Sequence, residues 1–115
     1  MENKNVSQLV IKYVMTVTDR TFADLSVGTL AYSFKIERSK LSRQFKRHTA
    51  MTLENFLFKE KMARASFLLK AYGDITVKEV AERIGFCSCD YFIRKFRQFY
   101  GIAPGKYREF KNARC

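Results

Sequence analysis

One pattern of apolar residues occurs twice in this sequence, about fifty residues apart, and this repeat restricts the possible folds more than any other feature. The clearer copy runs from Thr76 to Arg108. At an offset of 50, Val77, Val80, Ala81 and Ile84 correspond to Val27, Leu30, Ala31 and Phe34. At an offset of 51, Phe92, Arg94, Phe96 and Arg97 correspond to Leu41, Arg43, Phe45 and Lys46. Two copies are too few for a solenoid, so the repeat indicates a duplicated unit within one small protein.

Each copy has the pattern of two short helices joined by a tight turn, which is typical of a helix-turn-helix. In the later copy, Thr76 and Glu79 can form a capping box. Gly85 can end that helix in the left-handed conformation usual there, and Ser88 can cap the next one. The apolar face of this next helix carries Phe92, Phe96 and Phe99. In the first copy Lys35 replaces Gly85, and because a non-glycine residue is uncommon in a left-handed turn, we expect a different turn geometry.

The whole chain predicts an all-α fold of about seven helices, because it has one proline and no linker rich in glycine or serine. We expect the helices at about 6–18, 26–34, 37–47, 52–71, 76–84, 89–100 and 104–112. Residues 18–24 are expected to be a connector. The expected architecture is one domain, residues 1–115, with two helix-turn-helix lobes (about 6–51 and 72–112) joined by a long helix (about 52–71).

The charge is strongly positive and unevenly distributed. The 115 residues include 22 Lys and Arg and 11 Asp and Glu, a net charge of +11. Residues 1–34 have no net charge, residues 35–71 carry +7, and residues 72–115 carry +4. Such a field attracts a polyanion, nucleic acid first and an anionic membrane second. A ribosome-associated protein, or a basic protein with no such partner, is the alternative.

The expected helix at 37–47 has the densest positive charge, with five basic residues between Arg38 and Arg47. On a helical wheel, Leu41 and Phe45 share the face towards the core. The opposite face carries Ser39, Ser42, Arg43 and Lys46, flanked by Lys40 and Arg47. Arginine can bridge the two acceptors of a guanine, serine can donate or accept, and lysine can reach phosphates, so this face suits a major groove. The alternative is a basic helix face that is only solvated and contacts no DNA.

The expected helix at 89–100 has a less basic outer face. Its outward residues are Asp90, Ile93, Arg94 and Arg97, with Lys95 beside them. A carboxylate can accept from cytosine, and an aliphatic side chain can touch a thymine methyl. A weaker DNA contact than that of the helix at 37–47 is the alternative. Lys106 and Arg108 follow within expected reach of the phosphates. The long helix at 52–71 would span about 30 Å, close to the roughly 34 Å of one DNA turn, so it could place two units on successive major grooves.

Several classes of function find no support in the sequence. With one histidine, no clustered carboxylates and no glycine-rich phosphate loop, we expect no enzyme, cofactor or metal site. Cys87, Cys89 and Cys115 form neither a disulfide framework nor a zinc set, so we expect reduced thiols, with Cys87 as a small core residue. A regulatory role of the Cys89 thiol is the alternative. Neither a membrane-spanning run nor a signal peptide is evident, which predicts a cytoplasmic protein without a membrane partner.

The second copy resembles the DNA-binding domain of the AraC/XylS family of bacterial transcription regulators. The motif that carries the resemblance is Ile84-Gly85-Phe86, Tyr91-Phe92, Phe96, Gly101, Pro104 and Tyr107-Arg108. The first copy (Leu30-Ala31, Phe34, Leu41-Ser42-Arg43, Phe45-Lys46) and the long helix (Phe56 to Leu69) agree less tightly. The sequence departs from the family pattern at Lys35 and Ala50, where glycine is usual, and at Lys61, where arginine is usual.

The resemblance implies two recognition helices, at about 37–47 and 89–100, that enter successive major grooves of double-stranded DNA. By position, the base-facing residues would be Ser39, Ser42, Arg43, Asp90, Ile93 and Arg94. Contacts to phosphates or flanking positions are predicted for Arg38, Lys40, Lys46, Arg47, Lys95, Arg97, Lys106 and Arg108.

The function implied is sequence-specific DNA binding and transcription regulation in the bacterial cytoplasm, at the nucleoid, with RNA polymerase as a further partner. We expect this domain to be monomeric, with any dimerisation through a region outside this chain. Most family members carry a separate effector or dimerisation domain, so the chain is either a stand-alone regulator or a fragment of a longer one. Binding to RNA or membrane is the alternative, although the phenylalanines lie on faces better suited to a core.

Overall fold

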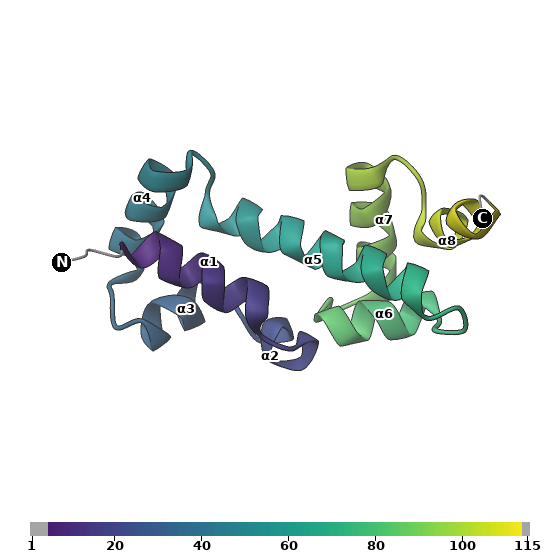
Figure 1. Cartoon of the computed structure of the whole chain (residues 1–115), viewed down its shortest axis with the longest axis horizontal. Coiled ribbons are helices and arrows are strands. Elements are labelled where there is room, and N and C mark those ends of the chain that lie inside the picture. The colour runs from purple at the N-terminus through teal and green to yellow at the C-terminus, as the bar shows by residue number, and fades with distance from the viewer. Residues whose placement is uncertain (1–4, 114–115) are drawn as a thin grey trace. The chain divides into compact units, whose positions relative to one another are not determined.

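The computed structural model describes residues 5–113, and within that range the chain is all-helical with eight helices and no strands (Figure 1). The helices are α1 (Val6–Thr16), α2 (Asp19–Ala23), α3 (Val27–Ser33), α4 (Arg38–Thr49), α5 (Leu53–Ala71), α6 (Val77–Ile84), α7 (Cys89–Tyr100) and α8 (Pro104–Ala113). The all-α prediction is confirmed. The helix ends are set largely by side-chain caps, since Ser26, Thr76 and Ser88 each accept a hydrogen bond from the backbone N–H three residues later.

The expected connector at 18–24 is wrong, because it contains the eighth helix, α2. The Thr18 side chain accepts a hydrogen bond from the N–H of Thr21 at 3.3 Å, which caps this helix. Phe22 anchors it in the core with 1% of its surface exposed. A helix of five residues is too short to show a periodic pattern and depends on such packing to form.

The chain divides into two compact units, residues 1–60 and 61–115, with the boundary inside α5. In the first unit, α1 and α3 both pack against α4 (Figure 1). The fully buried side chains of this core include Val10, Val14, Phe22, Leu30, Leu41 and Phe45. Ser7 adds a polar link between α1 and α4, because its hydroxyl lies 3.4 Å from the Gln44 carbonyl and 3.2 Å from Nδ1 of His48.

The second unit is built around aromatic rings from α7, from α8 and from the turn that precedes α7. The centroid of the Phe92 ring lies 5.0 Å from that of Phe86 and 5.6 Å from that of Phe96. Tyr107 packs on Phe96 at 5.2 Å, and its hydroxyl lies 2.9 Å from the buried hydroxyl of Ser66. Such pairs stabilise by about 0.5–1.5 kcal/mol each beyond the apolar area they bury. This core therefore holds α7 firmly in place within its unit.

The expectation that the first helix-turn-helix turn differs in geometry holds for its length but not for its left-handed residue. Lys35 lies two positions before the N-cap Glu37, whereas Gly85 lies three positions before the N-cap Ser88. Lys35 has a φ of 56°, in the same left-handed region as Gly85 at 101°. The hydrogen bonds agree too, since the N–H of Ile36 donates to Ala31 at 3.0 Å and that of Phe86 donates to Ala81 at 2.9 Å. The packing of the two helices therefore imposes the turn on Lys35 despite its side chain.

Two burial expectations are also wrong. Phe99 was assigned to the apolar face of α7, yet 40% of its surface is exposed. Its ring packs edge-on against Tyr100, at the margin of the core. Cys87, expected as a small core residue, is exposed. In both cases the sequence pattern predicts which way the side chain points. Burial also requires a neighbouring element that covers the side chain.

Candidate nucleic-acid interface

The exposed face of α4 is positively charged along its whole length. Leu41 and Phe45 are fully buried, and this anchoring turns the opposite face of the helix to solvent. The outward residues that the structure exposes are Arg38, Ser39, Lys40, Arg43, Lys46 and Arg47. Ser42 is half-buried. All the α4 side chains predicted to contact DNA are therefore accessible, Ser42 in part and the others fully.

A shallow groove borders this surface. Ser42, Arg43, Lys46 and Arg47 line it together with Thr52, Leu53 and Glu54. The last three residues stand at the start of α5, where the Thr52 hydroxyl accepts from the N–H of Asn55 at 3.1 Å. The sequence does not predict that Thr52 lies beside α4, because that position depends on the left-handed turn at Ala50. A carboxylate at Glu54 also limits how closely a polyanion can approach this end.

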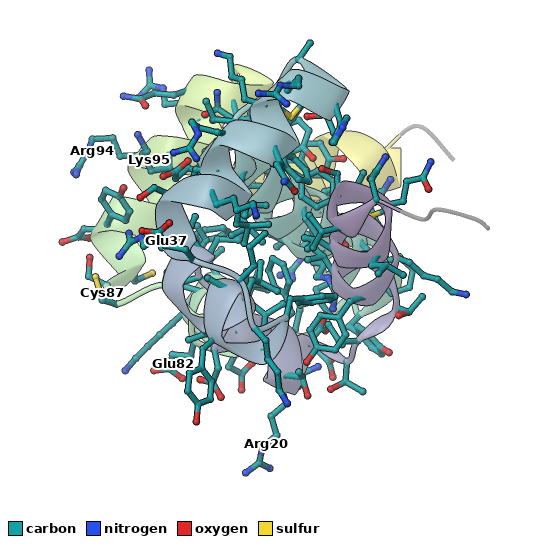
Figure 2. The ribbon with its side chains drawn as sticks, turned by 90° about the vertical axis from the view of Figure 1, so that its left-hand side faces the viewer. Arg20, Glu37, Glu82, Cys87, Arg94 and Lys95 are labelled. Atoms are coloured by element: carbon teal, nitrogen blue, oxygen red, sulfur yellow. The ribbon has the colours of Figure 1, made fainter. Side chains whose placement is uncertain are left out.

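The outer face of α7 is more mixed, as the sequence predicted. Asp90, Arg94 and Arg97 are exposed, whereas Ile93 and Lys95 are half-buried. Figure 2 shows Arg94 extending outward from the molecule, with Lys95 labelled beside it. The helix is held by Phe92 and Phe96, both fully buried, so these side chains are presented from a fixed support.

The sequence missed an aromatic contact on this face. The guanidinium carbon of Arg94 lies 5.3 Å from the ring centroid of Tyr91, and Nζ of Lys95 lies 5.7 Å from it. Both distances are within the range of a cation–π interaction. The signal that could have found it is the i, i+3 and i, i+4 spacing of a tyrosine and two cations on one helix.

The two α8 residues predicted to contact DNA, Lys106 and Arg108, differ in their surroundings. Lys106 is exposed. The Arg108 guanidinium instead donates to the Leu69 carbonyl at 3.4 Å and to the Ile75 carbonyl. Leu69 belongs to the last turn of α5, where carbonyls lack partners within the helix. These contacts favour a structural role for Arg108 over the phosphate contact that we predicted.

Lys61, which stands where arginine is usual in the resembling family, faces inward in the second unit. Its Nζ lies 4.8 Å from the ring centroid of Phe86. Burial lowers the pKa of Lys61, and the negative charge of a Cys87 thiolate opposes that shift. Lys61 is therefore half-buried against Phe86 rather than fully exposed like the α4 cations.

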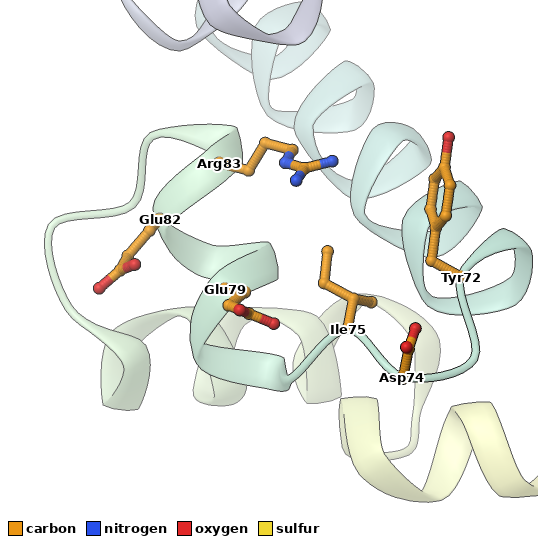
Figure 3. A pocket seen from close by; sticks show the side chains of 6 residues that line it. All are labelled: Tyr72, Asp74, Ile75, Glu79, Glu82 and Arg83. Atoms are coloured by element: carbon orange, nitrogen blue, oxygen red, sulfur yellow. The ribbon is translucent and has the colours of Figure 1, made fainter.

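Acidic residues gather at a separate pocket in the second unit. Tyr72, Asp74, Ile75, Glu79, Glu82 and Arg83 line it (Figure 3). Three carboxylates repel a polyanion, so this pocket is unsuited to nucleic acid. Glu79 is also engaged locally, because its carboxylate accepts from the N–H of Thr76 at 2.8 Å in the capping box.

Within residues 5–113 the structure groups no three His, Cys, Asp or Glu side chains that could hold a metal ion. Cys115 lies outside the described residues. No helix in the described range has both the length and the apolar character needed to cross a bilayer.

Comparison with known proteins identifies transcription regulators of similar sequence. The sequence is 35% identical over 91 residues to an uncharacterized HTH-type transcriptional regulator, YpdC, of Escherichia coli (strain K12), covering 79% of this chain and 32% of that protein. It is 30% identical over 100 residues to the xylose operon regulatory protein of Haemophilus influenzae, covering 87% of this chain and 26% of that protein. The chain thus spans about a third or less of the length of these relatives.

The fold is also similar to that of the DNA-binding domain of AdpA, a global transcriptional factor whose crystal structure contains a target DNA. The TM-score is 0.80 and the identity 27%, with 97% of this chain and 96% of that one covered. The family model described as "Helix-turn-helix domain" matches residues 30–109, well over half of the chain. With its duplicated helix-turn-helix and its regulator relatives, the chain belongs to the helix-turn-helix domain family of the AraC type.

Proposed function

We propose that this chain is the sequence-specific double-stranded DNA-binding part of a bacterial transcription regulator. The observation that carries the proposal is the outer face of α4, where five basic side chains and an exposed serine project from a helix anchored by fully buried residues. Clustered arginine and lysine on the second helix of a helix-turn-helix supply both the electrostatic attraction and the donors that read base edges. The similarity to the DNA-bound AdpA domain supports the same proposal.

Within this proposal the outward side chains of α4, α7 and α8 divide by role. Ser39, Ser42 and Arg43 of α4, with Asp90, Ile93 and Arg94 of α7, face bases. The remaining cations position the protein on phosphates, and among them Arg108 acts chiefly inside the protein. The chain acts as one domain of two lobes, with α5 as the connecting helix and the two recognition helices in successive major grooves.

The same proposal covers partners and location. The relatives are named as regulators, which supports a regulatory role. The proposal adds that the chain is not an enzyme, that it acts in the cytoplasm at the nucleoid, and that RNA polymerase is a further partner. The chain itself is proposed to be monomeric.

The test is a selection of binding sites from a randomised duplex pool with the purified chain. We expect an enriched sequence motif. Ser39→Ala and Asp90→Ala should change the preferred bases more than the overall affinity, and Arg43→Ala should lower affinity for the enriched site by about 1–3 kcal/mol. An Arg43→Ala variant that loses affinity equally for the enriched site and for random DNA would make Arg43 a phosphate contact. A pool without enrichment would contradict the proposal as a whole.

A further inference from the structure

The ring of Tyr91 connects the core of the second unit to an arginine on its outer face. Tyr91 is the third residue of α7, and its N–H donates to the Ser88 hydroxyl at 3.0 Å. Its ring centroid lies 6.0 Å from that of Phe86, which is itself 8% exposed and packs on Phe92. On its outer side the ring, 39% exposed, meets the Arg94 guanidinium at 5.3 Å. The Tyr91 ring therefore contacts both the core residue Phe86 and the outward guanidinium of Arg94.

We propose that Tyr91 is a positioning residue for DNA recognition, whose ring holds the Arg94 guanidinium in the orientation that reads a base. The inference rests on the proposed function, and within it Tyr91 itself touches no base. Tyr91 thus affects base preference indirectly, through the side chain of Arg94.

The geometry of arginine makes the two contacts compatible. The five N–H donors of a guanidinium lie in its plane, whereas a ring contact uses its face. Arg94 can thus rest on Tyr91 and still donate along the plane to the two acceptors of a guanine. A long, flexible side chain that is already ordered in the free protein loses less conformational entropy when it binds, so pre-ordering favours affinity.

The first unit provides an internal comparison. At the offset of 51, Arg43 corresponds to Arg94, and Lys40 occupies the place of Tyr91. Lysine offers no ring, and its charge repels a neighbouring guanidinium. Arg43 is exposed, and the structure gives it no ring partner among the described residues. The two recognition helices therefore present equivalent arginines in different ways, with only that of α7 supported by an aromatic side chain.

A double-mutant cycle tests the inference. The wild type, Tyr91→Leu, Arg94→Ala and the double variant are titrated by fluorescence anisotropy against the duplex that the wild type selects from a random pool. We expect Tyr91→Leu to weaken binding about two- to fivefold and to relax preference at the same base pair as Arg94→Ala. In the Arg94→Ala background, Tyr91→Leu should have a clearly smaller effect, limited to the remaining contact between the ring and Nζ of Lys95 at 5.7 Å. Tyr91→Phe, which keeps the ring, should bind like the wild type.

Phe99→Leu is the matched control, because it removes a ring of similar exposure (40%) from the same helix, and it should leave binding unchanged. Thermal unfolding of each variant, followed by circular dichroism, confirms that all are folded at the assay temperature. An equal loss in both Arg94 backgrounds, or no loss at all, would overturn the inference while the wild type still selects a site. If the wild type selects no site, the proposed function fails first.

Discussion

At the scale of single residues, the repeat places different side chains in equivalent backbone conformations. Ala50 and Gly101 both follow a recognition helix and both have positive φ, 64° and 85°. The left-handed conformation costs an alanine about 1–2 kcal/mol, whereas glycine adopts it freely. The first unit therefore carries strain that the second avoids.

Exchanging these two residues should move stability in opposite directions. Ala50→Gly should stabilise by about 0.5–1 kcal/mol, because the relieved strain exceeds the added freedom of the unfolded chain. Gly101→Ala should destabilise by about 1 kcal/mol, and only through φ, since nothing lies within 4 Å of an added Cβ. Urea unfolding followed by circular dichroism measures both. A destabilised Ala50→Gly would show that Ala50 is not strained.

Arg108 has a residue-scale role that can be separated from DNA binding. Arg108→Met removes the hydrogen bonds to Leu69 and Ile75 and should lower the free energy of unfolding by about 1–2 kcal/mol. Lys106→Met, an exposed neighbour, should change it by less than about 0.5 kcal/mol. An Arg108→Met variant that unfolds like the wild type but binds DNA more weakly would restore Arg108 as a phosphate contact.

Some residue-scale features could not be predicted from the sequence. Helical spacing placed Phe92, Phe96 and Phe99 on one face, but only the first two are fully buried, because burial depends on the packing of other elements and not on spacing within the helix. Lys35 adopts a left-handed turn that propensity disfavours, since packing between α3 and α4 decides it. The ring contact of Tyr91 was visible in principle as a spacing, but the rotamers that bring ring and guanidinium together depend on the support from Phe86.

At the scale of elements, the longer helices were predictable and the short one was not. Thr76 and Ser88 cap helices as expected, because a cap depends only on residues that lie a few positions apart. α2 escaped prediction because its five residues rely on the burial of Phe22. For the candidate site, the outward face of α4 followed from periodicity, whereas the groove with Thr52 and Glu54 required the chain to fold back at Ala50.

The two basic helices should contribute unequally to DNA affinity. Lys46→Gln with Arg47→Gln removes two exposed charges from α4, and Arg97→Gln with Lys106→Gln removes two from α7 and α8. We expect the first pair to weaken binding more, since residues 35–71 carry +7 and residues 72–115 carry +4. Each pair that contacts phosphates should reduce the slope of log affinity against log salt by about 2. Affinities measured over a series of salt concentrations test this, and a larger loss from the second pair would contradict it.

At the scale of the whole molecule, the net charge of +11 and the duplicated helix-turn-helix point to the same polyanionic partner. The composition alone predicted a polyanionic partner, and the family match shows that this chain has a helix-turn-helix fold. The DNA sequence that is read does not follow from either, because it depends on the poses of a few side chains such as Arg43 and Arg94 against base edges.

The measurement that tests the central claim most directly compares three ligands of equal length. The purified chain is titrated with the duplex enriched by selection, with an unrelated duplex of the same base composition, and with an RNA duplex of the enriched sequence. The enriched DNA should bind tighter than the unrelated DNA by on the order of 10³-fold, and affinity should fall steeply with salt for both. Equal affinity for all three, or a preference for RNA, would contradict sequence-specific recognition of double-stranded DNA.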